Sequence, residues 1–353
     1  LGFIDRSALW TVLCLSGLAL TIFAVSGALA QGPASGSPVI QGINRGLSPV
    51  VKFDVSPPLR AIRIAPLGPG QISVNEDREI MPMRVRFAPE WDPVVQSTLG
   101  TGAASGTEIP APLVSFNAQP NVNGVVPPDP NAAVGPNHIV AMCNLTFQIF
   151  NKTGTSLFGP AANNTLWTGF GGACETSNSG DPVVLYDRMA DRWLLSQFTA
   201  TSAPYMECIA ISTSSDPTGS YFRYAFSTGN NFPDYPKAGV WPDAYYFSTR
   251  EFAGGVTFVG VGAYALNRAQ ALAGNASPQL ISFLVPPIGG GANVGDGLLP
   301  SDLDGPTLPP AGRPNCYMGT QDNNASYGAT TDALNPYRFH ADFGTPTNST
   351  FAL

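Results

Sequence analysis

Residues 180–198 read GDPVVLYDRMADRWLLSQF, and this stretch decides the fold. An Asp-Pro pair, Asp181 and Pro182, opens it, and two apolar runs follow on either side of a polar turn at Asp191 and Arg192. Short apolar runs bounded by turn residues are typical of buried β-strands. The stretch therefore predicts two strands joined by a tight turn, both lying in a protein core.

The same pattern recurs along the chain. Repeats begin near Asp129, Asp181, Asp234 and Asp304, at intervals of about 50 residues or more, and each leads through a turn into an apolar run. A third apolar run follows in three of the repeats, at residues 147–150, 208–211 and 263–266. Short consecutive strands repeated at this interval are typical of the blades of a β-propeller.

The composition of the runs supports stacked blades. Residues 244–247, Ala-Tyr-Tyr-Phe, are apolar on both faces of a strand, so a sheet that contains them must be covered on both sides. We therefore predict an all-β protein of the β-propeller class, with a β-sandwich as the alternative. Residues 129–353 suffice for about four blades, and we expect an incomplete or truncated ring of about four to five.

The N-terminal segment has the pattern of a secretory signal. Residues 8–25 are almost wholly apolar, and small residues around Ala28 and Ala30 resemble a cleavage site. We expect residues 1–30 to be removed, which predicts a secreted, periplasmic or cell-surface protein without stable membrane insertion afterwards. The alternative is an uncleaved membrane anchor, which the length of the apolar run permits.

Residues 31–112 form a proline-punctuated leader and linker region before the blades at 113–353. Two short alternating pieces in it, residues 51–55 and 83–87, predict isolated edge strands.

Four cysteines follow the signal, an even number in a chain expected to enter an oxidising compartment. We favour a disulfide between Cys174 and Cys208, which flank one predicted strand pair, and a second between Cys143 and Cys316 is the weaker pairing.

Charge and histidine content exclude several function classes. The net charge is −7 and no cluster of Lys and Arg occurs, which argues against nucleic-acid binding. Only two histidines exist, His138 and His340, so zinc sites built on paired histidines are excluded.

Residues 180–198, together with residues 208–219 and 232–243, resemble stretches of uncharacterised secreted bacterial proteins of predicted β-propeller fold. This resemblance implies the fold and an exported location. Residues 214–219 are more distantly similar to a hairpin of propeller glycosidases of the arabinanase and xylosidase type and of sialidases, which implies a blade and no activity.

The repeated aspartates are candidate site residues. In the simpler interpretation, Asp129, Asp181, Asp234 and Asp304 accept backbone N–H groups in turns. In the functional interpretation they converge on the axis of the propeller, where a hard cation such as calcium relieves their repulsion. Calcium is the one cofactor that the sequence suggests.

A glycoside hydrolase needs two carboxyl groups beside the scissile bond. Asp129 or Asp181 is the candidate base, and the candidate acids are Glu175, Glu207 and Glu251. Glu251 follows Arg250, and an ion pair is the simpler explanation for it.

Two aromatic residues suggest a binding surface. Trp167 and Phe170 lie in a polar, glycine-rich loop, where exposed rings suit stacking on sugars or contact with protein. The alternative is packing of the loop against its own blade. We predict an exported binding or scaffold module for an extracellular glycan or protein. A glycosidase-like hydrolase and a cation-stabilised structural protein remain the alternatives, and the sequence leaves the question of enzymatic activity open.

Overall fold

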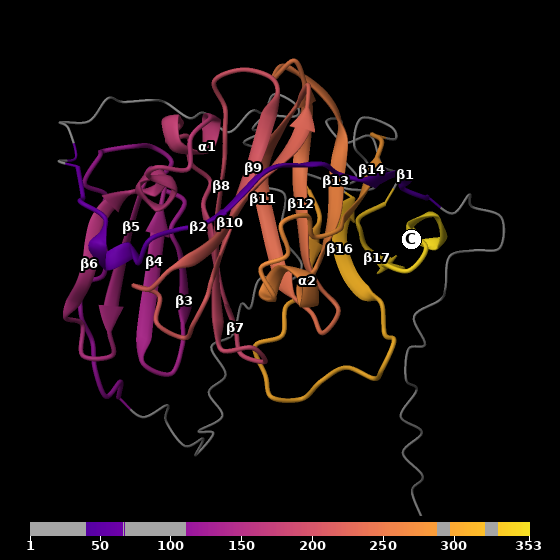
Figure 1. Ribbon diagram of the computed structural model, residues 1–353. Helices are drawn as coiled ribbons and strands as arrows, with labels where there is room; N and C mark the ends of the chain where they lie inside the picture. The colour runs from indigo at the N-terminus through magenta and orange to yellow at the C-terminus, as the bar shows by residue number, and fades with distance from the viewer. Residues whose placement is uncertain (1–39, 66, 68–110, 288–296, 322–330) are drawn as a thin grey trace, which may run out of the picture. The chain divides into compact units, whose positions relative to one another are not determined.

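The sheets are antiparallel meanders whose strands follow one another along the chain, except that the outer strands of two sheets come from the leader (Figure 1). The computed structural model describes residues 40–65, 67, 111–287, 297–321 and 331–353, all within the unit Val39–Leu353. These residues form four sheets, so the predicted all-β class is confirmed. The expected signal at 1–30 and the expected strand at 83–87 lie outside the described residues.

In sheets 1 and 2 the first strand begins just after the predicted start of the repeat. Sheet 1 consists of β3 (Asn131–Val134), β4 (His138–Cys143), β5 (Thr146–Asn151) and β6 (Ser156–Ala162). Sheet 2 consists of β7 (Val183–Asp187), β8 (Arg192–Phe198), β9 (Tyr205–Ser212), β10 (Tyr221–Gly229) and β2 (Val50–Val55). Residues 180–198 thus form the start of sheet 2, with the predicted turn between β7 and β8.

The remaining two sheets follow the same order. Sheet 3 consists of β11 (Asn231–Val240), β12 (Ala244–Ala253), β13 (Thr257–Asn267), β14 (Leu280–Val285) and β1 (Ile43–Leu47). Sheet 4 consists of β15 (Leu299–Pro300), β16 (Asn315–Gln321), β17 (Ala333–His340) and β18 (Thr350–Ala352). Helices are short: α1 (Ala173–Thr176), α2 (Arg268–Leu272) and the 3-10 turns Leu59–Ala61, Asn163–Trp167 and Pro346–Asn348. In the described part of the chain, no helix has the length and apolar character needed to cross a membrane.

Sheets 2 and 3 are buried on both faces, as the sequence predicts. Tyr245 and Phe247 of β12 pack in a cluster with Ile209 of sheet 2. Tyr246, which points to the opposite face of β12, packs in a cluster with Tyr317 of sheet 4. Strands that are apolar on both faces can be covered only between two neighbouring sheets. Sheet 4 differs, because the residues of β17 alternate between exposed and buried.

The leader region crosses the outer edges of the sheets, as the indigo trace in Figure 1 shows. Gln41 bridges to Ala352 of sheet 4, β1 pairs with β14, and β2 pairs with β10. Leu59 then enters the core shared by sheets 1 and 2. The predicted strand at residues 51–55 is confirmed as β2, but it is the outer strand of a blade rather than an isolated strand.

The repeat starts match the inner strands in two sheets and depart from them in the others. β3 and β7 begin just after Asp129 and Asp181. Asp234 lies inside β11, beside a bulge between Asp234 and Lys237. Asp304 lies after β15 and not before it, because the inner strand of sheet 4 is formed by Leu299–Pro300 upstream.

The cysteines are divided between one bridge and two thiols. Cys174 of α1 and Cys208 of β9 form a disulfide, which confirms the favoured pairing. Cys143 and Cys316 are both free thiols, so the weaker expectation is wrong. Cys143 instead lies beside the Thr146 hydroxyl, 3.1 Å from its sulfur, where a β-turn brings the two residues together.

An ion pair between a buried arginine and a partly exposed aspartate joins the leader to sheet 2. The guanidinium of Arg223, which is 1% exposed, donates to Asp54 of β2 at 2.7 and 2.6 Å. It also donates to the carbonyl oxygens of Leu166 and Thr168 at 2.9 and 3.0 Å. The side chain therefore joins β10, the leader and the loop before α1.

We expect Arg223→Met to lower the free energy of unfolding by about 2 kcal/mol, because it leaves two carbonyl groups and the partly exposed Asp54 carboxylate without their donor. Arg60→Met is the matched control: the Arg60–Asp216 pair lies in the same region but is 59% and 43% exposed, so its loss should cost less than about 1 kcal/mol. Urea unfolding of both variants measures the difference, and equal losses would contradict this assignment.

We also expect reduction of the disulfide, or the double change Cys174→Ala and Cys208→Ala, to destabilise the fold by about 3 kcal/mol. The bridge closes a loop between residues 34 positions apart, which restricts the unfolded chain. Thermal unfolding with and without reductant tests this. A Tm that does not change on reduction would show that the bridge adds nothing to stability.

Candidate functional site

The first strands of all four sheets border one cavity of about 350 Å³, which we name the axial pocket. Its wall comprises Asp129, Pro130 and Asn131 from sheet 1, Asp181, Pro182, Val183 and Leu185 from sheet 2, Tyr235, Pro236, Lys237 and Ala238 from sheet 3, and Leu299 and Pro300 from sheet 4. Two of the predicted aspartates therefore share one cavity. Asp234 is 3% exposed and does not line it.

Three residues of this wall have left-handed backbone conformations. The φ angles are 41° at Asp129, 37° at Asp181 and 50° at Tyr235, and each of these residues directly precedes a proline. A positive φ is unfavourable for a residue with a side chain, and proline restricts the preceding residue further. Such strain, of about 1–3 kcal/mol per residue, is concentrated at functional sites in proteins. Sheets 1, 2 and 3 each contribute one of these strained residues to the wall of the axial pocket.

Side-chain oxygens near the pocket tie each sheet to the next. Asn131 Oδ1 of sheet 1 accepts from the Val184 amide of sheet 2 at 2.7 Å. Asp181 Oδ2 of sheet 2 accepts from the Tyr235 amide of sheet 3 at 3.2 Å. The bond shown for Asp181 is thus a tie between two sheets and not a bond within its own turn.

Sequence reasoning missed the cationic and aromatic part of the pocket. Lys237 Nζ lies 3.4 Å from the centroid of the Tyr235 ring, and Arg250 Cζ lies 4.4 Å from it. Cations over an aromatic face are attracted by the ring quadrupole. The aromatic and the lysine in residues 234–237 are a sequence signal for a binding site. Their place in the pocket wall depends on the bulge in β11, which the sequence does not predict.

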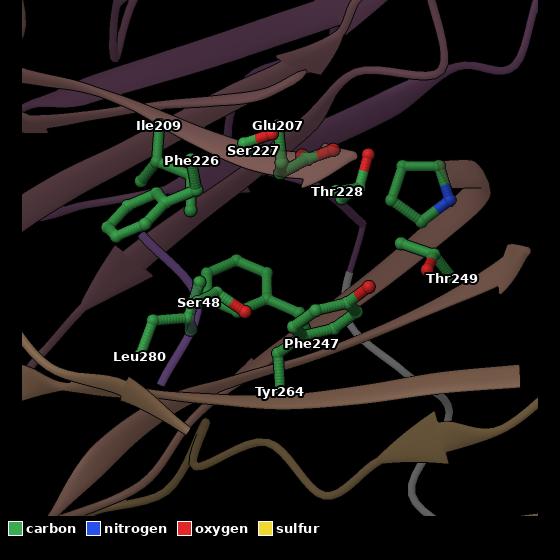
Figure 2. A pocket seen from close by; sticks show the side chains of 11 residues that line it. Ser48, Glu207, Ile209, Phe226, Ser227, Thr228, Phe247, Thr249, Tyr264 and Leu280 are labelled. Carbon is green, nitrogen blue, oxygen red and sulfur yellow. The ribbon is translucent and has the colours of Figure 1, made fainter. Parts of the chain in front are cut away.

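Glu207 lies apart from the axial pocket, in a small cavity of about 20 Å³ between sheets 2 and 3 (Figure 2). Both of its carboxyl oxygens are buried and have no hydrogen-bond partner among the described residues. Burial raises the pKa of Glu207 to about 8; the charge of Asp181 adds to the rise, and the nearby Ser196 hydroxyl opposes it. A carboxyl group enclosed in this way does not reach a molecule in the axial pocket.

Glu251 is fully engaged in a structural network. Its carboxylate accepts from Arg45 of β1 at 2.8 Å on each oxygen, from the Tyr264 hydroxyl at 2.5 Å and from Asn231 Nδ2 at 2.7 Å. The ion pair expected for this residue exists, but the partner shown is Arg45 from the leader. Glu251 therefore holds the leader to sheet 3, and it does not line the axial pocket.

Glu175 also has a structural role. Its carboxylate accepts from the amides of Gly169 and Gly171 at 2.8 and 2.6 Å. The backbone hydrogen bond from Gly169 is the largest cause of a lowered pKa of Glu175. This side chain therefore closes the loop before α1 and does not face the axial pocket.

Trp167 and Phe170 do not form an exposed platform. They are 0% and 1% exposed, so the expectation of a binding surface at these rings is wrong. The 3-10 turn Asn163–Trp167 directs Trp167 inward, and the Phe170 ring lies 5.2 Å from Lys52 Nζ and 5.3 Å from Arg223 Cζ. Burial of large aromatic surfaces stabilises the loop more than exposure would.

Of the four aspartates predicted to hold a cation, Asp129 and Asp181 line the axial pocket, while Asp234 and Asp304 do not. No group of three or more His, Cys, Asp or Glu side chains in the described ranges is arranged to hold a metal ion. Asp304 is separate from the axial pocket: its carbonyl oxygen accepts from Arg188 in the loop after β15.

Comparisons with known proteins name no family for this chain. No family model matches it, and no curated protein matches it. Among solved structures, a provisional glycoside hydrolase from Parabacteroides distasonis has a TM-score of 0.32 at 10% identity, covering 64% of this chain and 72% of that chain. A glycosyl hydrolase from Bacteroides ovatus has a TM-score of 0.31 at 10% identity, covering 64% and 69%. The GH43 BlXynB protein from Bacillus licheniformis has a TM-score of 0.24 at 11% identity, covering 62% and 53%. Likeness at this level carries no argument about activity.

Glu207 makes a testable contribution to pH dependence. Its pKa is raised from 4.5 to about 8 on folding, so the folded protein holds a proton that the unfolded chain releases. The stability it contributes is complete below pH 4.5 and is lost as the pH rises to about 8. Relative to Glu207→Gln, the wild type should lose stability by roughly 1 kcal/mol per pH unit across this window. Urea unfolding from pH 5 to 9 measures the difference, and parallel curves would contradict the assignment.

Proposed function

We propose that this protein is an exported binding module that holds an extracellular glycan in the axial pocket. The observation that carries the proposal is the pocket itself, to which the first strand of every sheet contributes wall residues. Ligand sites in proteins are concave and combine apolar walls with a few placed polar groups. Asp129, Asp181, Lys237 and Tyr235 provide such groups here.

A glycan suits this wall better than a protein surface does. Sugar hydroxyls donate to carboxylates and accept from ammonium groups, and both are present within one cavity of about 350 Å³. Protein partners, in contrast, are usually held over about 800 Å² of surface on each side. The disulfide agrees with an oxidising compartment outside the cytoplasm.

A glycosidase is the second candidate function, because Asp129 and Asp181 line the same pocket. Binding without turnover is favoured, since Glu175, Glu207 and Glu251 are held away from the pocket. The low-scoring likeness to glycoside hydrolases does not alter this balance.

We expect the protein to bind at least one oligosaccharide from a panel of xylo-, arabino-, cello- and chito-hexamers in calorimetry. Asp129→Asn should weaken that binding at least tenfold, because a charged acceptor contributes about 1.5–3 kcal/mol. Asn tolerates the left-handed backbone of Asp129, so the variant should fold.

Asp304→Asn is the control, since Asp304 is exposed and does not line the pocket. Absence of binding to every sugar, or equal weakening by both variants, would overturn the proposal. Release of reducing ends from a bound sugar would favour the hydrolase instead.

A further inference from the structure

The Glu207 carboxyl group is buried between sheets 2 and 3, and its oxygens have no hydrogen-bond partner among the described residues. Glu207 is 7% exposed and lies in register between Phe198 of β8 and Phe226 of β10. Across the cavity, Thr249 of sheet 3 also has a buried hydroxyl oxygen without a hydrogen bond among the described residues (Figure 2). An ionised carboxylate at this place would lack both solvent and donors, which is costly in a low dielectric.

One charged group near Glu207 belongs to the axial pocket. Pro236, which follows Tyr235, lines both the Glu207 cavity and the axial pocket, and the charge of Asp181 contributes to the raised pKa of Glu207. Asp181 also lines the pocket and accepts the Tyr235 amide, and Tyr235 is part of the same wall. Glu207 therefore lies behind the part of the wall that joins sheets 2 and 3.

The other titratable groups on the strands packed around Glu207 are engaged elsewhere. Tyr264 of β13 lines the same cavity and donates its hydroxyl to Glu251, and Arg45 balances that carboxylate. Lys237 of β11 and Arg250 of β12 lie over the Tyr235 ring. Asp234 of β11 pairs in register with Arg250.

We infer that Glu207 is a proton-holding positioning residue of the axial pocket, whose ionisation beside Asp181 loosens the tie to Tyr235 and weakens ligand binding. This inference rests on the proposed binding function of the pocket. Glu207 and Asp181 are both buried, and two carboxylates repel each other strongly where solvent screens them poorly, so the charged state is relieved by a shift of Asp181 or by entry of water. Asp181 and Tyr235 both have left-handed backbone conformations, and the hydrogen bond between them helps to hold these strained conformations. When the bond weakens, the two residues are free to relax.

The direct experiment observes the tie without a ligand. The Tyr235 amide is followed by ¹⁵N–¹H NMR from pH 6 to 9.5, together with the ¹³C carboxyl signal of Glu207. In the wild type both signals should change with one midpoint near pH 8, the pKa that burial of Glu207 produces. The Tyr235 step should be absent in Glu207→Gln and retained in the matched control Glu175→Gln, whose carboxylate serves another loop. A Tyr235 signal without a step, or a step that persists in Glu207→Gln, would overturn the inference.

A second arm measures binding of the hexasaccharide that calorimetry identifies from the panel above. Affinity in the wild type should fall about tenfold between pH 6.5 and pH 9, a coupling of ordinary size, and should be unchanged in Glu207→Gln. Binding that is independent of pH would overturn the inference while the proposed function stands. If no sugar binds, the proposed function fails, and the wild-type NMR titration still decides whether Glu207 controls the Tyr235 tie, even where the Gln variant is unstable.

Discussion

Burial of both faces of sheets 2 and 3 is the constraint on which the rest of the structure depends. Consecutive residues of β12 enter different clusters, with Tyr245 facing sheet 2 and Tyr246 facing sheet 4. A single sheet of this composition would expose an apolar face to water, so the sheets are stable only as neighbours. This requirement orders the sheets along the chain and brings their first strands to one cavity.

The polar groups of the interior secure this stack. Asp187 accepts from Arg268 at 2.6 and 3.0 Å and from the Tyr245 hydroxyl at 2.8 Å, which joins sheet 2 to sheet 3. Arg223 and Glu251 bind the leader to the same two sheets. Buried charges are tolerated because each has several partners, and the leader is thereby part of the fold rather than an extension of it.

Glu207 departs from that rule. Its carboxyl oxygens have no hydrogen-bond partner among the described residues, and the effect of the nearby Ser196 hydroxyl is smaller than those of burial and of the Asp181 charge. The axial pocket beside it also holds three strained residues. Proteins retain unfavourable features of this kind where local consistency conflicts with function, which is why we propose the ligand site at the sheet 2 to sheet 3 side of the axial pocket.

The sequence by itself determined the local features: the strand-turn-strand pattern of residues 180–198, the leader strand at 51–55, and the Cys174–Cys208 pair. These depend on patterns within short stretches, which periodicity and turn residues report. The tertiary structure alone decided which candidates reach the pocket. Trp167 and Phe170 became core, and Glu251 found Arg45, 206 positions away. Burial and pairing between distant segments depend on how the sheets stack, and no local pattern carries that information.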